Sequence, residues 1–496
     1  MKRLLIISAL ILTAAWQTMS QTSVDALRYS RIDIGGTARY MGLSGAFGAL
    51  GADFTTASTN PAGIGMFKSS EFTITPAVHI GAINSDYNGT QMSDSRANFY
   101  LGDIGMVMTA KLKTDPKKPA FRTFTFATGM NRLNDFNYRA DMEGYNDKNS
   151  FLDTYVESAN GIPFSEIEND AYGDYAYDLN LAWWTYLLDL YNPNINNLYV
   201  SPVPSQSLKY QSKYVDTHGS MNEYVFSFAT NYNDRLYLGM TFGIPFIRYF
   251  EYDVYEESLI NNSDLKYFQK IDNLETRGTG FNMKFGLIYR ASDWFRIGAS
   301  IHTPSWFGNM RDYWVTTMTS NFYTPDKDGK YSYVETSPSG NYNYNLRTPF
   351  RAQGSMAFII GNVGLISAEY EYVDYANAQL DAPDYNFSQE NAAIQNSYTG
   401  GNNFRIGTEW RYNIFSFRAG GKYFTSPYQN NINDASEWGF SAGLGLRQKW
   451  FFMDLTYSYT QSNQDYYFYK TNDINPGPVY NKISSNCILI TTGVKL

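Results

Sequence analysis

The sequence predicts an all-β protein, a transmembrane antiparallel β-barrel of about 14 strands with an N-terminal hatch. Three observations lead to this prediction: the composition, a two-residue alternation of apolar and polar side chains, and the spacing of the connections. Of the 496 residues, 17% are aromatic and only 17% are charged. A soluble globular domain carries about 25% charged residues, and a disordered chain is poor in aromatic residues. The composition therefore fits neither class.

Charge and residue types exclude further classes. No run of about 18 apolar residues follows the N-terminal region, which excludes a helical membrane protein. The formal net charge of −8 argues against a nucleic-acid partner, because such partners recruit basic surfaces. The single cysteine, Cys487, excludes an intrachain disulfide framework and a cysteine-rich metal site.

Residues 1–20 are predicted to be a secretory signal peptide. Lys2 and Arg3 form a charged start, an apolar stretch runs from Leu4 to Ala15, and small residues follow in Thr18-Met19-Ser20. The apolar stretch is too short to span a bilayer as a helix. We therefore expect the protein to leave the cytoplasm.

Residues 21–70 are predicted to form a compact hatch, since they are rich in glycine and lack alternation. The segment ends in Asn60-Pro61-Ala62-Gly63, which we take as the hatch motif. Its glycine spacing invites comparison with a phosphate-binding loop, but no strand precedes it and no Lys-Ser/Thr follows. Close packing of backbone inside a narrow lumen is the better interpretation.

Residues 71–496 are predicted to form the barrel, because their side chains alternate with a period of two. Phe281 and Phe285, for example, share one face of a strand, and Asn282 and Lys284 share the other. Strands of a soluble β-sandwich would also alternate. Here the apolar faces are rich in aromatic residues and the polar faces carry small and charged residues. A lipid-facing wall around a polar lumen requires this arrangement.

The connections between the predicted strands alternate between short and long. Outer-membrane barrels combine short periplasmic turns with long outer loops, and a sandwich has no reason to follow that rule. The longest connection is expected to be an extracellular insertion at about 136–220, and the sheet must close because backbone groups in lipid need partners. The candidate strands are 71–85, 98–112, 121–135, 221–233, 235–252, 277–291, 293–304, 349–360, 363–375, 402–412, 414–426, 436–448, 450–464 and 483–496.

Histidine and charge patterns give no catalytic or metal motif. His79, His218 and His302 are far apart in the sequence and lack metal-ligand spacing, so we expect no metal and no cofactor. Glu369 and Glu371 share a strand face and are expected to form lumenal ion pairs with arginines rather than to act as acid and base.

An alternative use of the basic residues concerns a ligand. We consider that Lys284, Arg405 or Arg418 binds a ligand carboxylate through charge-assisted hydrogen bonds.

The sequence resembles the FadL-type long-chain fatty acid and hydrophobic-compound transporters of Gram-negative outer membranes. The resemblance extends along the chain and rests on Gly42-Leu43-Ser44-Gly45-Ala46-Phe47, Asn60-Pro61-Ala62-Gly63, Phe285-Gly286-Leu287-Ile288-Tyr289, Asp293-Trp294-Phe295-Arg296-Ile297-Gly298, Thr348-Pro349, Glu369-Tyr370-Glu371-Tyr372-Val373-Asp374-Tyr375, Arg405-Ile406-Gly407-Thr408-Glu409-Trp410 and Arg418-Ala419-Gly420. It implies a monomeric barrel with a hatch, a ligand-binding lumen and an inward kink in the third strand that opens the wall sideways. The chain departs from the family in its terminal Leu496, where an aromatic residue is commonest, and in tyrosine-rich outer loops without an obvious apolar groove.

The function expected from these features is passive uptake of long-chain fatty acids or other hydrophobic small molecules, with release into the outer-membrane lipids. Gly129, in the third strand, is the candidate for the lateral gate, since glycine suits a bend. A porin or haem receptor is an alternative. A hatch argues against an open porin, and haem binding would require a histidine in the lumen. A barrel enzyme would need a Ser/His/Asp constellation, for which the chain has no local motif.

Overall fold

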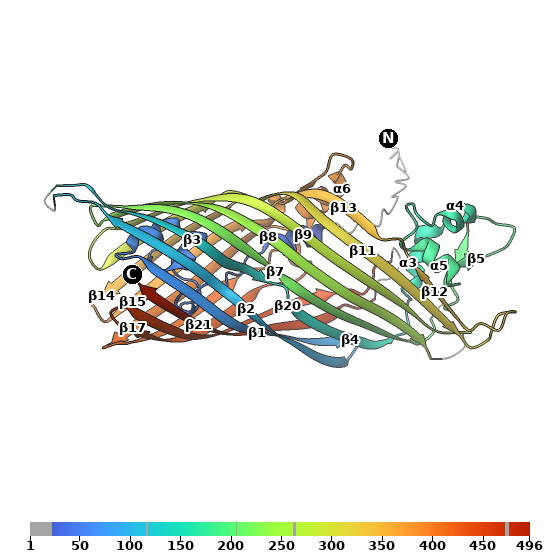
Figure 1. The fold of residues 1–496 in the computed structure, drawn as a ribbon. Helices are drawn as coiled ribbons and strands as arrows, with labels where there is room; N and C mark the ends of the chain where they lie inside the picture. Colours follow the sequence, from blue (N-terminus) through green and yellow to red (C-terminus); the bar gives the residue numbers. More distant parts are fainter. Residues whose placement is uncertain (1–21, 116–117, 205, 261–263, 472–475) are drawn as a thin grey trace, which may run out of the picture.

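A computed structural model describes residues 22–115, 118–204, 206–260, 264–471 and 476–496, and the predicted signal peptide lies outside this range. The described strands form a closed antiparallel barrel of 14 strands, in which β1 pairs with both β2 and β21 (Figure 1). The wall consists of β1 (Glu71–Tyr87), β2 (Thr90–Lys111), β3 (Phe121–Asp135) continued by β4 (Tyr138–Asn146), β7 (Lys209–Tyr232), β8 (Leu236–Leu259), β9 (Leu265–Arg290), β10 (Phe295–His302) continued by β11 (Trp306–Phe322), β13 (Gly340–Arg347) continued by β14 (Arg351–Ile360), β15 (Gly364–Asp374) continued by β16 (Gln379–Asp381), β17 (Gly400–Tyr412), β18 (Phe415–Phe424), β19 (Glu437–Arg447), β20 (Phe451–Tyr466) and β21 (Val479–Lys495).

The side chains of these strands alternate between the outer surface and the lumen, as predicted. On β18, Phe415 and Phe417 are exposed, whereas the alternating residues Ser416 and Arg418 are buried. The exposed faces are apolar and suit lipid, and the inward faces are polar. Among the described residues, no helix is long and apolar enough to cross a membrane.

The predicted short turns all lie at one end of the barrel, near the C-terminus, and by the outer-membrane rule this is the periplasmic end. At the other end, several strands are longer than predicted. Residues 86–97, expected in a loop, instead belong to β1 and β2 and to the tight turn between them. That turn is Asn88-Gly89, and both residues have positive φ angles, 50° and 88°, as a two-residue hairpin turn requires.

The large insertion between β4 and β7 lies beyond the barrel end opposite to the C-terminus (Figure 1). Its predicted range, 136–220, was too wide, because residues 138–146 and 209–220 continue the β-ladder. Its elements are α3 (Leu152–Ala159), α4 (Phe164–Asn169), α5 (Leu179–Trp184), β5 (Asp189–Leu190) and β6 (Tyr199–Val200). Other connections contain β12 (Ser332–Thr336), α6 (Ser388–Ser397) and two short 3-10 helices, η3 (Tyr375–Asn377) and η4 (Gln429–Asn431).

The N-terminal segment, residues 22–70, packs against inward-facing groups from several sides of the barrel. The backbone of Ala38 bonds to Thr491 of β21 at 2.7 Å and to Thr456 of β20 at 2.6 Å. The Gly48 N–H donates to Glu369 of β15 at 2.8 Å. The segment contains α1 (Ser23–Ser30), α2 (Ala38–Met41) and the 3-10 helices η1 (Phe54–Ser58) and η2 (Pro61–Met66).

Candidate functional site

The hatch motif forms a tight turn docked on the barrel wall. The Asn60 side chain accepts a hydrogen bond from the Ala62 N–H and donates to the Gly48 carbonyl at 2.7 Å. Pro61 occupies the first turn of η2, where its missing N–H costs nothing. Two glycines of the wall, Gly239 on β8 and Gly286 on β9, leave room for this turn, because a Cβ at either position would overlap it. Of these two glycines, Gly286 belongs to a sequence block that carries the family resemblance, whereas Gly239 was not identified from the sequence.

A polar cavity of about 40 Å³ lies between part of the N-terminal segment and the wall. Ile32, Ile34 and Met41 line it from the segment, and Lys284 and Arg405 line it from the barrel. A second lumenal cavity of about 350 Å³ lies nearer the outer end and is bounded by a larger share of rings. These rings belong to Phe136, Tyr138, Tyr249, Tyr375 and Phe424.

Lys284 is paired with a carboxylate of the protein itself. Its Nζ forms an ion pair with Glu223 of β7 and donates to Asn282 Oδ1 at 2.8 Å. Ser58 of the N-terminal segment donates to the other Glu223 oxygen at 2.8 Å. All four polar side chains are buried, and Glu223 already occupies the position that a ligand carboxylate would take beside Lys284.

Arg405 is held in the predicted lumenal ion-pair belt. Its guanidinium lies 3.1 Å from Glu369 and 3.6 Å from Glu371, and Arg351 reaches Glu371 at 3.3 Å. The two glutamates therefore meet arginines, as expected. Arg405 also lines the polar cavity, so part of its side chain would lie beside a ligand bound there.

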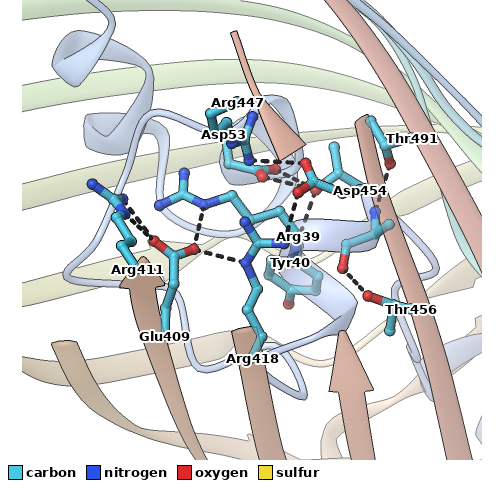
Figure 2. A network of polar contacts seen from close by, with 12 residues as sticks. Arg39, Tyr40, Asp53, Glu409, Arg411, Arg418, Arg447, Asp454, Thr456 and Thr491 are labelled. Atoms are coloured by element: carbon cyan, nitrogen blue, oxygen red, sulfur yellow. Dashed lines mark hydrogen bonds and ion pairs between the residues drawn. The ribbon is translucent and has the colours of Figure 1, made fainter. Parts of the chain in front are cut away.

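Arg418 is enclosed in a network at the periplasmic half of the lumen (Figure 2). It bonds to Glu409 and Asp454, each at 2.7 Å, and its side chain is 0% exposed. Arg39 shares Glu409 at 3.1 Å, and Arg447 shares Asp454 at 2.8 Å. Of the three candidates, Arg418 does not line the polar cavity, so it cannot meet a ligand there without rearrangement.

The third strand separates from the second, but beyond Gly129 rather than at it. Gly129 itself still pairs with Gly105 of β2 and with Val225 of β7. The ladder between β2 and β3 ends at the pair Asp103 and Asn131. From there β3 and its continuation β4 pair with β7, while residues 90–101 of β2 pair with β1. The hydrogen-bonded ladder between β2 and β3/β4 is thus interrupted here, although β4 still packs against β1 and β2, and we call this interruption the side gap.

The N-terminal segment takes the place of β2 along the bent region of β3. The Gly35 N–H donates to the Arg132 carbonyl at 3.1 Å, and the Asp33 N–H donates to the Leu133 carbonyl at 3.0 Å. Asn134 also donates to the carbonyl of Arg31 at 3.1 Å. Buried carbonyls that lose a ladder partner need another one. The segment thus completes the hydrogen bonding of the bend.

Charged side chains cross the side gap near its outer end. Arg96 of β2 forms an ion pair with Asp216 of β7, which also accepts from Arg139 of β4 at 3.0 Å. Nearer the bend, Asn98 of β2 donates to Asp135 of β3 at 3.3 Å. The residues that bound the side gap were not found from the sequence, because no local motif marks contacts between distant strands.

The three histidines are separated, as expected. His79 lies 3.4 Å from Asp135, His302 Nε2 lies 2.6 Å from the Thr59 carbonyl, and the His218 ring stacks on Phe250. Among the residues that the structure describes, no group of three or more potential metal ligands is found.

Comparison with solved structures places this barrel among known folds. A Pseudomonas aeruginosa FadL homologue superposes with a TM-score of 0.53 and 10% identity, covering 93% of this chain and 98% of the other. The P. putida toluene transporter TodX superposes with a TM-score of 0.53 and 12% identity, covering 94% and 99%. No family of known sequences matches the chain. No curated protein matches it either.

The fold is that of an outer-membrane, multi-pass β-barrel. More particularly, it has the FadL and TodX type of architecture, with the strands matched over almost the full length of both chains.

Proposed function

We propose that this protein takes up small hydrophobic molecules passively across the outer membrane and releases them sideways, through the side gap, into the membrane lipids. The observation that carries this proposal is the separation of β3 from β2 beyond Asn131. The gap lies within the lipid-facing band, because Phe99 beside it is 73% exposed and its neighbour Val78 on β1 is also exposed.

The energetics favour this route for an apolar ligand. Burial of each methylene is worth about 0.8 kcal/mol, so a long chain that has entered the lumen gains nothing by returning to water. A sideways exit transfers it from an apolar lining to lipid. In the outer lumenal cavity, the rings form the apolar part of a lining that also contains charged side chains such as Arg28 and Asp135.

In this proposal the N-terminal segment is the hatch and the barrel works as a monomer. The hatch motif anchors the segment to β8 and β9, and the segment also bonds to the bent region of β3. The segment therefore stands between the lumen and the periplasm. This arrangement argues against a porin, which needs an open water-filled channel.

The test of this proposal measures uptake after strands β2 and β3 have been cross-linked across the side gap. Asn98→Cys with Asp135→Cys, in a Cys487→Ser background, joins β2 to β3 across the gap. A Met106→Cys and Thr128→Cys pair on the intact ladder is the control. At equal barrel abundance, oxidation of the first pair should stop uptake of hexadecanoate and toluene, and reduction should restore it. Unchanged uptake in the pinned barrel would refute lateral release.

Fatty acids are one ligand class that the proposal includes, with Lys284 or Arg405 as the partner of the carboxylate. Hexadecanoate and hexadecanol share a chain length and differ in that group. If Lys284 recognises the carboxylate, the double substitution Lys284→Met with Glu223→Leu, which leaves no unpaired charge, should weaken binding of hexadecanoate alone. Equal losses for both ligands would assign the ion pair a structural role.

A further inference from the structure

The periplasmic end of the lumen contains a cavity of about 810 Å³ that is separate from the ligand cavities described above. The N-terminal segment forms one side through residues 50–52 and 66–69, and strand ends and short turns form the other. Its lining includes six basic and two acidic side chains. These are Arg39, Lys68, Arg296, Arg411, Arg447 and Lys495, with Glu71 and Glu409.

This region has fewer acidic than basic side chains, so not every positive charge can be neutralised by a carboxylate. In Figure 2, Arg39, Arg411, Arg418 and Arg447 surround Glu409 and Asp454, and Asp53 lies nearby. Glu409 pairs with Arg39, Arg411 and Arg418, and Asp454 pairs with Arg418 and Arg447. Asp53 nearby accepts hydrogen bonds from Thr37 and Thr55. With Asp53 included, four arginines stand against three carboxylates, so the network keeps an excess of one positive charge.

The other basic side chains add to this excess. Within the described residues, Arg296, Lys68 and Lys495 have no carboxylate within ion-pair distance. Arg296 Nη1 donates to the Leu50 carbonyl at 3.3 Å, but its Nε is buried with no hydrogen-bond partner in the described chain. Arg411 is 52% exposed toward the cavity. Donors without partners and an accessible guanidinium thus face one space.

We propose that this cavity binds a phosphate group. The chain as a whole carries a net charge of −8, so the positive cavity is a local feature and not a general property. Guanidinium groups bind phosphate oxygens by paired, charge-assisted hydrogen bonds, and several converging bases suit a group with several charged oxygens. Walls of protein around the cavity strengthen the attraction.

The phosphate can come from a phospholipid head group of the inner leaflet or from free phosphate. The volume of the cavity exceeds that of a phosphate ion alone. The cavity lies at the periplasmic end of the barrel, which is level with the head groups of the inner leaflet. A bound phosphate would bridge Lys68 of the N-terminal segment to Arg296 and Arg411 of the wall, and so fasten the segment to the barrel.

The test measures binding by calorimetry to the mature protein in neutral detergent at low salt. The probes are inorganic phosphate and dihexanoyl phosphatidylglycerol. The variant is Arg296→Gln with Arg411→Gln, and the control is Arg277→Gln with Arg311→Gln, at two exposed positions outside the cavity. Heat-modifiable migration on gels checks that each barrel is folded.

We expect saturable binding that is weakened at least tenfold in the cavity variant and unchanged in the control. If phosphate binds and the lipid does not compete with it, the natural ligand is the free ion. If the lipid displaces bound phosphate, the natural ligand is a phospholipid head group. If the cavity variant misfolds, the salt dependence of phosphate binding to the wild-type protein tests the proposal instead. Salt screens the attraction between the basic side chains and phosphate, so the affinity should fall steeply as the salt concentration rises. Equal affinity in both variants, no saturable binding of either probe, or a flat salt dependence would overturn the proposal.

Discussion

The backbone N–H of Gly35 donates a 3.1 Å hydrogen bond to the carbonyl oxygen of Arg132, where strand β3 has left its partner β2. The first of these residues belongs to the N-terminal segment and the second to the barrel wall. The contact makes the segment a substitute strand along the bend. If the segment acts as a hatch, we expect its movement to alter the side gap, because the Gly35–Arg132 and Asp33–Leu133 backbone hydrogen bonds join the two.

Substitution of Gly35 by proline should loosen this link, because proline lacks the N–H donor. Loss of one buried hydrogen bond costs about 1 kcal/mol, and the Arg132 carbonyl is left unpaired. We expect faster amide exchange in residues 31–36 by mass spectrometry, with the barrel strands β17 to β21 unchanged. Gly35→Ala is the control, since it keeps the N–H. Equal exchange in both variants would contradict the link.

The ion pair between Arg96 and Asp216 is predicted to hold the outer end of the side gap closed. Arg96→Asp should place two carboxylates together and widen the gap, which raises the uptake rate of a bulky hydrophobic ligand. The swapped pair, Arg96→Asp with Asp216→Arg, restores opposite charges. Arg139, which also contacts Asp216, is left unchanged in both variants.

Uptake of a fluorescent long-chain fatty acid by cells with equal barrel abundance provides the measurement. The single variant should exceed wild type and the swapped variant should return toward it. If the single variant and the swap behave alike, the pair has no gating role.

The barrel could be predicted because alternation is a local signal that every strand repeats. Phe404 and Ile406 are exposed and Asn403 is buried, as the period of two requires. From the same signal, the strands at the outer end were predicted to be shorter than they are in the structure. Residues 90–98 are polar, so they resemble a loop, although the Asn88-Gly89 turn before them indicates a hairpin.

The site was less predictable because its contacts join distant segments. The sequence predicts Lys284 and Arg405 as inward-facing bases and a pairing of Glu371 with an arginine, but Glu223, the partner of Lys284, follows from the strand register, which the sequence alone does not set. Gly129 is the gate candidate because glycine offers a local signal, and its φ of 155° departs from ordinary strand geometry. The ladder between β2 and β3 continues for two more residues, to Asn131, beyond which the N-terminal segment bonds to β3.

The insertion is predicted to be more stable at mildly acidic pH than at neutral pH. Burial raises the pKa of Asp178, at the start of α5, from 3.8 to about 6. The folded insertion therefore binds more protons than the unfolded one between these values, and its stability falls as pH rises through this window. Protease digestion of the insertion should be slower at pH 5 than at pH 7. Asp178→Asn, which keeps an acceptor for the Leu179 N–H, should flatten this dependence; persistence of the full effect would assign it to another group.

Gly129→Ala should strain the junction of β2, β3 and the N-terminal segment. Gly129 has a φ of 155°, and a Cβ there would overlap the Ile104 carbonyl oxygen and lie 2.7 Å from the Phe54 ring of η1 and 2.8 Å from the Cα of Gly105. Overpacking of this kind costs about 1–3 kcal/mol. We expect a lower unfolding temperature in detergent, together with faster amide exchange in residues 53–58, because Phe54 must move away from the wall.

Gly354→Ala is the matched control for this substitution. Gly354 lies in strand β14, and a Cβ there would meet open space on the outer surface. Its unfolding temperature and the exchange of residues 53–58 should equal those of wild type. If Gly129→Ala lowers stability without faster exchange in residues 53–58, the strain is confined to the wall, and Gly129 does not connect the N-terminal segment with the bend in β3. If both effects appear, hydrophobic uptake by the same variant should change as well, since the bend that begins beyond Gly129 bounds the proposed exit.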